Sequence, residues 1–389
     1  MKQFVYADNA ATTKLDIDAF EAMKPYLLYE YGNTSQHYSF ARQPKKALKE
    51  ARTYIAECIN ASPEEIYFTS GGTESDNWAI KGIALNCPVA QIITSQIEHH
   101  AILNSCKAVE MMGIPVAYLS VTRQGVVEPT ELESVITNST KLVSVMYANN
   151  EIGSIQPIKE LCDIAHKKGA LFHTDAVQAV GHIRIDVKEL GIDLLSASAH
   201  KFNGPKGIGF LYVKKGTPIF PYANGGSQES SLRAGTENVA AIVGMAVALK
   251  KNCEQIDKMS KHITDLESKL LSLLKTYNVP FIRNGANNHL VGNISLSFPG
   301  KDGEAIMHIL DLHGICVSTG AACDTVNTEI SHVLKAIGLQ EKYAKGTIRI
   351  SLGKNNTNED VQHIADSLKK IEFDFKTYKN FAEAQKHEK

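Results

Sequence analysis

The chain has 389 residues, 43% of them hydrophobic, and its 41 Lys and Arg nearly balance 42 Asp and Glu, giving a formal net charge of −1. This length exceeds the ~100–200 residues of an average domain, so we expect two lobes with separate cores. The balanced charge excludes a general attraction for nucleic acids or anionic membranes. The longest wholly apolar run, residues 239–249, is far shorter than the ~20 residues of a membrane span.

The amino terminus has no apolar stretch of signal-peptide length before its polar residues, so we expect a soluble, cytoplasmic protein. The seven cysteines are an odd number, and no two of them form a C-x-x-C pair. This pattern predicts free thiols and no metal site, because a disulfide framework or a zinc site needs paired cysteines.

Between about residues 64 and 213, short runs rich in β-branched residues recur between helical stretches. The runs are residues 66–68, 91–93, 116–119, 142–145, 170–172, 193–195 and 208–211. Their spacing predicts an α/β domain with a mainly parallel seven-stranded sheet and helices on both faces. Ligands of such sheets bind at the carboxyl ends of the strands, so we expect the site in the polar segments that follow these runs.

The second part of the chain predicts a smaller α+β lobe. Apolar residues step by three and four over residues 256–274, which predicts a long helix that links the lobes; a coiled coil is the alternative, but the pattern is too short for one. Strands are expected over residues 291–298 and 347–351. A capping-box pattern over residues 357–360 begins a closing helix, and one face of that helix joins the core. That face consists of Val361, Ile364, Leu368 and Ile371.

A glycine pair after the first predicted strand is a candidate phosphate cradle. Gly71 and Gly72 leave backbone N–H groups accessible, and the helix that follows contributes the positive end of its dipole. The segment lacks the Gly-Lys-Ser/Thr of a P-loop and the spaced glycines of a dinucleotide fingerprint. A plain strand-to-helix turn is the alternative.

Two charged residues lie just beyond other predicted strands. Lys201, in a polar, glycine-rich turn, could form a Schiff base with a carbonyl cofactor; a solvated surface lysine is the alternative. Asp175 lies at another strand end, one helix and one strand earlier, where a carboxylate could hold a pyridinium nitrogen protonated.

Four motifs together resemble the class V aminotransferase group of pyridoxal-phosphate enzymes, and most closely the cysteine desulfurases of the NifS/IscS type. They are residues 71–75, 175–178, 198–201 and 232–238. The likeness extends from residues 6–13, through residues 32–35, to residues 347–353. It implies a homodimeric fold-type I enzyme. Residues 14–255 would form the large domain that binds pyridoxal 5′-phosphate, and residues 1–13 and 256–389 the small domain with the catalytic cysteine loop.

The resemblance also implies roles for individual residues. Lys201 would hold the cofactor covalently and shuttle protons, Asp175 would pair with the pyridine nitrogen, and His99 would stack on the ring and move protons. Asn150 and Gln178 would address the ring hydroxyl. The phosphate would be held by Gly72, Thr73, Ser198 and His200, with Thr236 of the second subunit. L-Cysteine would be bound by Arg349, Asn150 and Asn33. Without the resemblance, Arg349 would be interpreted as a surface ion-pair arginine.

Cys323 is the expected nucleophile, because it alone among the cysteines lies in a segment of small residues that could carry a thiolate between substrate and acceptor. Cys316 lies in an apolar run and is expected in the core. The usual family loop reads Ser-Ser-Gly-Ser-Ala-Cys-Thr-Ser, and this chain departs from it at Thr319, Ala321 and Asp324. An anion beside the cysteine disfavours its thiolate. The stretch before residues 331–334 resembles the group with an extended catalytic loop.

The implied reaction converts L-cysteine to L-alanine and leaves a persulfide on Cys323 for an acceptor protein in iron–sulfur cluster assembly, tRNA thiolation or DNA phosphorothioation. No direct contact with nucleic acid or membrane is expected. Three alternatives stay open at this point. They are another class V enzyme such as a selenocysteine lyase or aminotransferase, a non-catalytic sulfur-assembly scaffold, and a nicotinamide dehydrogenase, which is disfavoured because no G-x-G-x-x-G follows an early strand.

Overall fold

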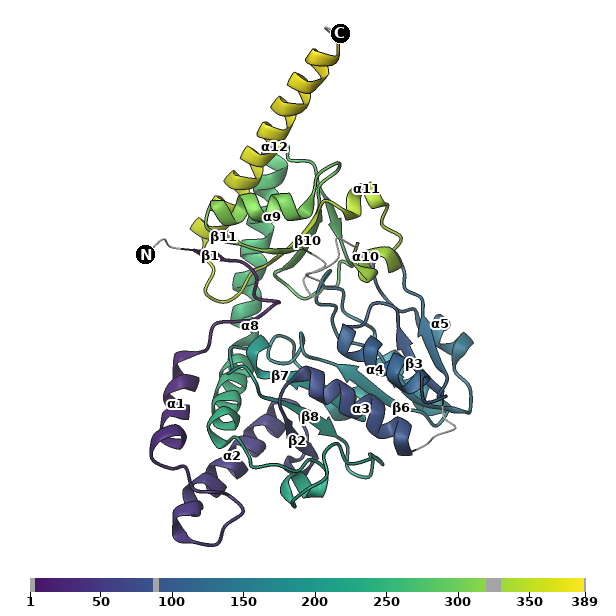
Figure 1. Ribbon diagram of the computed structural model, residues 1–389, viewed down its shortest axis with the longest axis vertical. Coiled ribbons are helices and arrows are strands. Elements are labelled where there is room, and N and C mark those ends of the chain that lie inside the picture. The colour runs from purple at the N-terminus through teal and green to yellow at the C-terminus, as the bar shows by residue number, and fades with distance from the viewer. Residues whose placement is uncertain (1–3, 87–90, 320–329, 388–389) are drawn as a thin grey trace. The chain divides into compact units, whose positions relative to one another are not determined.

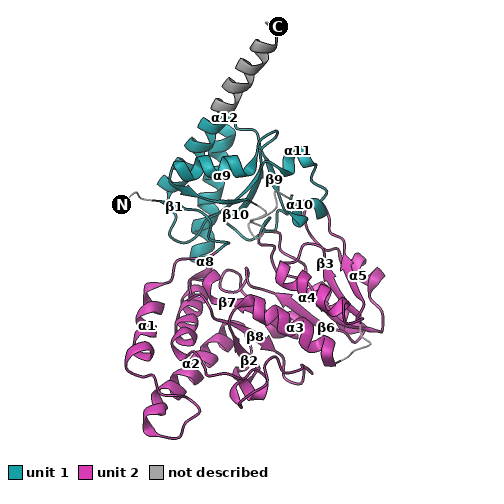
Figure 2. Ribbon diagram, viewed as in Figure 1, with its two compact units in different colours: residues 1–11, 151–153, 257–389 teal, residues 12–150, 154–256 magenta. Residues whose placement is uncertain are grey.

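The computed structural model of the protein describes residues 4–86, 91–319 and 330–387 (Figure 1). The chain forms two compact units (Figure 2). The larger unit contains residues 12–150 and 154–256, and the smaller contains residues 1–11, 151–153 and 257–389. Each unit has its own buried apolar core, as the length of the chain predicts.

The larger unit is built on a seven-stranded sheet of order β2-β8-β7-β6-β5-β3-β4. In that order the strands are Ile66–Thr69, Gly209–Val213, Leu194–Ser198, Leu171–Asp175, Thr140–Ser144, Gln91–Ser95 and Val116–Leu119. β8 is antiparallel to both neighbours, and every other neighbouring pair is parallel. The predicted mainly parallel sheet is confirmed. β8 reverses direction because the turn from β7 is too short for the crossover that a parallel strand requires.

Helices cover both faces of this sheet, so the larger unit has a layer of buried apolar side chains on each face. Alternate residues of the central strands contribute to the two layers. Leu142 and Leu194 pack under α3 (Gly72–Asn86) and α4 (His100–Glu110). Val143 and Leu195 face the other helical layer. That layer contains α1 (Ile17–Leu28), α2 (Arg42–Cys58), α5 (Pro129–Val135), α6 (Ile158–Lys167), α7 (Val187–Leu190) and the first part of α8 (Val239–Thr276). This alternation follows from the two-residue period of a strand.

The smaller unit combines a four-stranded antiparallel sheet with a short parallel pair. The sheet order is β12-β13-β10-β9, or Ser318–Thr319, Thr347–Ser351, Asn293–Ser297 and Ile282–Asn284. The parallel pair is β1 (Val5–Tyr6) and β11 (Ile315–Cys316). The helices of the unit are the end of α8, α9 (Gly303–Leu312), α10 (His332–Ala336), α11 (Glu341–Ala344) and α12 (Asn358–His387). The predicted α+β character is confirmed.

The closing helix α12 begins with the predicted capping box. The Thr357 hydroxyl accepts the N–H of Asp360, and the Asp360 carboxylate accepts the N–H of Thr357. Two N–H groups that have no acceptor within the helix are thereby satisfied. The four apolar residues predicted for its core face are all buried. Among the described residues, no helix is long and apolar enough to cross a bilayer.

The unit boundaries lie within two residues of those expected from the sequence. In addition, one short segment, residues 151–153, belongs to the other unit than expected. Thr13 belongs to the larger unit, because its hydroxyl donates to the carbonyl of His200 and accepts the N–H of Asn203. Residues 151–153 belong to the smaller unit, where Glu151 accepts a hydrogen bond from Ser331. Whether these units are functional domains stays a prediction.

Candidate active site

The carboxyl ends of β2, β6 and β7 bring three of the sequence motifs to one edge of the larger sheet. Asp175, the last residue of β6, is in register with Ser196 of β7. Ser198, the last residue of β7, is in register with Gly209 of β8, which is also in register with Thr69 of β2. This edge is where the sheet topology predicts a ligand.

The glycine pair forms a backbone cradle at this edge. Gly71 has a φ of +149°, and α3 begins at the next residue. A Cβ atom on Gly72 would lie 2.5 Å from Cγ2 of Val177, and one on Gly71 would lie 3.5 Å from Oγ of Ser198. The first N–H groups of a helix have no acceptor within the helix and carry its positive dipole end. A glycine cradle with these donors fits a phosphate group.

Glu74 connects this cradle to a distant segment of the chain. Its carboxylate accepts the N–H of Ser70 and pairs with Arg233, whose Nε lies 2.8 Å away. Burial alone would raise the pKa of Glu74, but hydrogen bonds from Arg233 and Ser70 lower it overall. The ion pair therefore fixes the segment that carries Thr236 against the first turn of α3.

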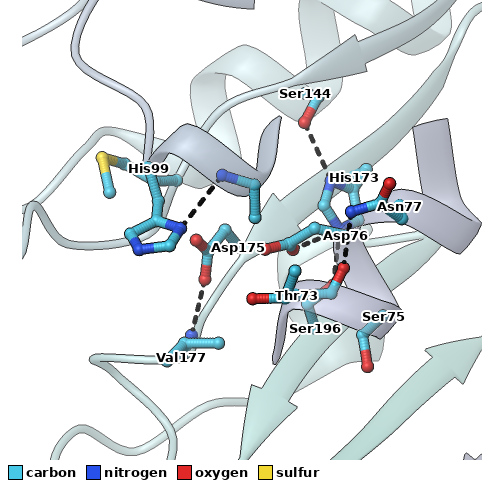
Figure 3. Close-up of polar contacts among 12 residues, drawn as sticks. Thr73, Ser75, Asp76, Asn77, His99, Ser144, His173, Asp175, Val177 and Ser196 are labelled. Atoms are coloured by element: carbon cyan, nitrogen blue, oxygen red, sulfur yellow. Dashed lines mark hydrogen bonds and ion pairs between the residues drawn. The ribbon is translucent and has the colours of Figure 1, made fainter. Parts of the chain in front are cut away.

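Asp175 provides a buried carboxylate next to the cradle. It is 5% exposed, and Oδ1 accepts the N–H of Val177 at 2.9 Å (Figure 3). Burial raises its pKa, and the His99 ring, the Val177 N–H and the Lys201 ammonium oppose this rise. A buried carboxylate in this position fits a protonated ring nitrogen as its partner.

His99 is held as the N-cap of α4. Its Nδ1 accepts the N–H of Ala101 at 3.1 Å, so the ring proton of the neutral form is on Nε2. Burial lowers the pKa of His99, the Asp175 carboxylate opposes this, and the Lys201 charge reinforces it. The carboxyl group of Asp175 is directed toward this ring (Figure 3).

Lys201 and His200 lie together in the short 3₁₀ helix Ala199–Lys201 that follows β7. Lys201 is partly buried, and its charge acts on Asp175, His99 and His200, whereas Lys206 is exposed. Burial and the two lysine charges lower the pKa of His200 to about 4, so its ring is neutral. Of the two lysines, Lys201 is therefore the partly buried one at the candidate site, and Lys206 is the one exposed to solvent.

The other predicted residues of the larger unit differ in their surroundings. Gln178 is buried in the turn after β6, and Asn150 is partly buried next to Asn149, whose amide donates to the carbonyl of Ile97 just before His99. Asn33 is partly buried and accepts the N–H of Ser35. The two exposed residues are Thr73 and Thr236.

In the smaller unit, Arg349 lies on β13 and is 3% exposed. Its Nη2 donates to Oδ1 of Asp8 at 2.8 Å. Nearby, burial raises the pKa of Glu151 to about 7 against the opposing effects of Ser331 and Arg349. Arg349 is therefore not a surface arginine.

Of the two cysteines that the sequence singles out, only Cys316 lies among the residues that the structure describes. Cys316 lies on β11, partly buried, and burial together with Asp311 and Asp8 raises the pKa of its thiol. Cys323 and the departures at Ala321 and Asp324 lie outside the described residues.

Comparison with known proteins identifies the family. The family model described as Aminotransferase class-V matches residues 5–364. The chain belongs to the class-V aminotransferase family. Cysteine desulfurase IscS of Dictyoglomus turgidum is 48% identical over 374 residues, which are 95% of this chain and 95% of that protein. Among solved structures, a NifS-like protein matches with a TM-score of 0.90 at 40% identity, over 95% of this chain and 99% of its own. SspA, solved in complex with cysteine, matches with a TM-score of 0.81 at 35% identity, over 91% and 100%.

This class-V family member is an enzyme of the cysteine desulfurase type, and its cofactor is pyridoxal phosphate. The predicted family, the fold class and the cofactor are thereby confirmed. The residues at the sheet edge fit this cofactor, because a glycine cradle, a buried carboxylate and a partly buried lysine occur together. The individual residue roles stay predictions.

One buried group escaped the sequence interpretation. Asp76, His173 and Ser196 lie behind Asp175, and Ser144 completes the group (Figure 3). A signal was present for His173, which is two residues before Asp175 and therefore on the same face of β6. No sequence pattern pointed to Asp76, because only the packing of α3 on the sheet brings it next to His173.

Proposed function

We propose that this enzyme converts L-cysteine to L-alanine and holds the released sulfur as a persulfide on Cys323. The observation that carries the proposal is geometric: Asp175, which ends β6 with its carboxyl group directed toward His99, and the partly buried Lys201, which follows β7, lie at the sheet edge that also holds the glycine cradle. The similar protein SspA, which was solved in complex with cysteine, supports this choice of substrate.

The chain's own residues orient the cofactor and move protons. Bound pyridoxal phosphate supplies an electron sink for negative charge that develops at the substrate Cα. Asp175 keeps the ring nitrogen protonated, and Gly72, Thr73, Ser198 and His200 bind the phosphate. Asn150 and Gln178 bind the ring hydroxyl.

Protons move at two nitrogen atoms. Nζ of Lys201 takes the proton from the substrate Cα, and Nε2 of His99, which carries the ring proton of the neutral form, donates toward the substrate. On the substrate side, Arg349 pairs with the carboxylate through its planar guanidinium, and Asn33 and Asn150 complete the binding.

Cys323 performs the transfer of sulfur. Its thiolate attacks the substrate sulfur, so an S–S bond forms and the substrate Cβ–S bond breaks. The electron pair of the broken bond stays on carbon, which then takes up a proton and becomes the methyl group of alanine. The balanced products are alanine and one persulfide.

The persulfide passes to an acceptor protein, and the candidate pathways are iron–sulfur cluster assembly, tRNA thiolation and DNA phosphorothioation. The enzyme acts as a cytoplasmic homodimer in which Thr236 reaches the phosphate of the other subunit. The exposure of Thr236 supports this arrangement. A pull-down that traps a mixed disulfide at Cys323 would identify the acceptor.

Paired cysteine variants test the proposal. Cys323→Ser keeps a side chain of similar size but removes the nucleophile, because a serine hydroxyl is scarcely ionised at neutral pH. We expect this variant to bind cofactor and L-cysteine while alanine production collapses and mass spectrometry finds no persulfide. Cys316→Ser is the matched control.

The control should stay active, because the raised pKa of Cys316 disfavours its thiolate. Full activity in both variants would refute the desulfurase mechanism, and reversed phenotypes would assign the nucleophile to Cys316. Activity without any persulfide would favour a lyase or an aminotransferase.

A further inference from the structure

Asp175 of the candidate site is one of three buried carboxyl groups that lie close together. Asp76 is on α3, Asp175 ends β6, and Glu98 follows β3; Asp76 is 1% exposed and Glu98 is fully buried. The charges of Asp175 and Glu98 both act on Asp76. Like charges in a low-dielectric interior repel strongly, so such a cluster cannot be fully ionised.

The imidazole ring of His173, which lies next to Asp76, does not compensate its charge. His173 is fully buried, with Nε2 at 3.9 Å from Oδ1 of Asp76. Its Nδ1 lies 2.8 Å from the Ser144 hydroxyl and its Nε2 lies 3.0 Å from the Ser196 hydroxyl. Burial lowers the pKa of His173 to about 3, so the imidazole is neutral.

The three carboxyl groups differ in the hydrogen bonds that support a negative charge. Asp175 accepts the N–H of Val177 and is near Lys201. Glu98 accepts bonds from the hydroxyl of Ser95 at 2.6 Å and the N–H of Met146 at 3.0 Å. Burial, reinforced by the charge of Asp175, nevertheless raises the pKa of Glu98 to about 8, so this group adds no negative charge at neutral pH.

Asp76 has less support than either of them. Its Oδ1 has no hydrogen-bond partner in the described part of the chain, and a hydrogen bond from the Ser196 hydroxyl is the support that its carboxyl group receives. Burial, reinforced by the charge of Asp175, raises the pKa of Asp76 well above its ordinary value. Figure 3 shows its carboxyl group directed toward Asp175.

We propose that Asp76 is a positioning residue that carries the proton of a buried carboxyl pair, so that the negative charge is confined to Asp175. Ser196, His173 and Ser144 form a chain of hydrogen bonds that continues from Asp76 across β7, β6 and β5. The proposal rests on the proposed function in one respect, namely that Asp175 faces the ring nitrogen of the cofactor. If Asp76 is neutral, Asp175 is the one ionised carboxylate of the pair, and the ring nitrogen pairs with it alone.

The protonation of Asp76 can be measured directly in the full-length holoenzyme. Infrared spectroscopy distinguishes the C=O stretch of a protonated carboxyl group from the bands of a carboxylate, and ¹³C-labelling of aspartate separates aspartate from glutamate. At neutral pH we expect one labelled carboxyl band that is lost in Asp76→Asn. Glu98→Gln is the control and should leave that band in place.

Two outcomes would overturn the proposal. One is the absence of a labelled carboxyl band in the wild-type enzyme, and the other is a band that persists in Asp76→Asn. Because neither result depends on turnover, a failure of the proposed desulfurase reaction would leave this measurement interpretable.

The pH dependence of unfolding provides a second measurement. An acid whose pKa is raised by folding stabilises the protein fully below its unfolded pKa, and this stability is lost as pH rises toward its folded pKa. Between about pH 5 and 7, the unfolding constant of the wild type should therefore rise about tenfold per pH unit relative to Asp76→Asn.

The other groups that face Asp76 are the same in both proteins. They are Asp175 and His173 from β6, Glu98 after β3, and the Ser196 hydroxyl from β7. Their contributions cancel in the comparison. A constant ratio of the two unfolding constants over this pH range would mean that Asp76 is ionised, and it would refute the proposal. The cofactor affinity of Asp76→Asn should stay within about twofold of the wild type, because asparagine has the shape and charge of a protonated aspartate.

Discussion

At the scale of single residues, a buried charged side chain needs a partner of opposite charge, and Arg349 is the example. Arg349 is buried on β13, and its ion pair with Asp8 joins two positions that are 341 residues apart in the sequence. An arginine has five donors in a planar fork, so one guanidinium can pair with Asp8 and also with a substrate carboxylate. In this arrangement Asp8 fixes the orientation of the fork.

We predict that Arg349→Ala raises the KM for L-cysteine by about 10- to 100-fold, because it removes a charge-assisted contact worth ~1.5–3 kcal/mol. The variant should also unfold more easily, since Asp8 loses its partner. Steady-state kinetics and thermal unfolding measure the two effects separately.

Arg283→Ala is a matched control, since Arg283 is partly buried in the same unit and pairs with Glu267. It should lose stability without a change in KM. An unchanged KM in Arg349→Ala would show that this arginine only stabilises the fold.

At the scale of elements, the backbone N–H groups at the start of α3 are the donors that the candidate site offers to a phosphate group. α3 begins in the glycine cradle and α4 begins at the His99 cap, so two helix N-termini are associated with the same edge of the sheet. The cradle requires glycine because the backbone of one element approaches another closely. At Gly209 of β8, a Cβ would lie 2.8 Å from the Cα of Gly71.

We predict that Gly72→Ala weakens cofactor binding by about tenfold or more, because the added Cβ crowds Val177 and overpacking costs ~1–3 kcal/mol. Reconstitution of the apoenzyme with pyridoxal phosphate would give the affinity. The double variant with Val177→Ala should recover most of it, since the atom that clashes is gone.

Gly82→Ala lies in the same helix, and its Cβ would lie 2.6 Å from Cγ1 of Ile219, so it is a control for crowding away from the cradle. It should reduce stability but leave the affinity for the cofactor intact. Equal losses of affinity in both variants would mean that the cradle does not bind the phosphate.

At the scale of the whole molecule, the larger unit exposes apolar side chains that a monomer would leave in water. Ile17, Leu28, Tyr29 and Tyr31 are each at least 60% exposed and lie close in sequence, in α1 and just after it. Exposed large apolar side chains mark interaction surfaces where they gather on one face. They support the proposed homodimer, in which Thr236 would complete the site of the other subunit.

Mixed dimers test this arrangement. A heterodimer of Lys201→Ala and Thr236→Ala subunits contains one intact site if Thr236 acts across the interface, and none if it acts within its own subunit. With two affinity tags to purify the heterodimer, we expect about half the wild-type activity. Activity no higher than that of the Thr236→Ala homodimer would place Thr236 in its own subunit.

Local sequence patterns were sufficient to predict many of the helices and strands of this chain. All seven strands of the larger sheet, the capping box of α12 and the positions of Asp175 and Lys201 after strands follow from periodicity and from residue chemistry over a few neighbours. The motifs and their order also identified the family. These features are readable because hydrogen bonding within a strand or a helix end involves residues close in sequence.

Burial and contacts between distant segments were decided only by the tertiary structure. The reversed direction of β8, the ion pair of Arg349 with Asp8, and the placing of residues 151–153 in the smaller unit all depend on how separate elements pack. The same is true of Asp76 and His173, which come from α3 and β6. Their protonation depends on desolvation and on charges through space, and neither quantity is determined by a residue's sequence neighbours.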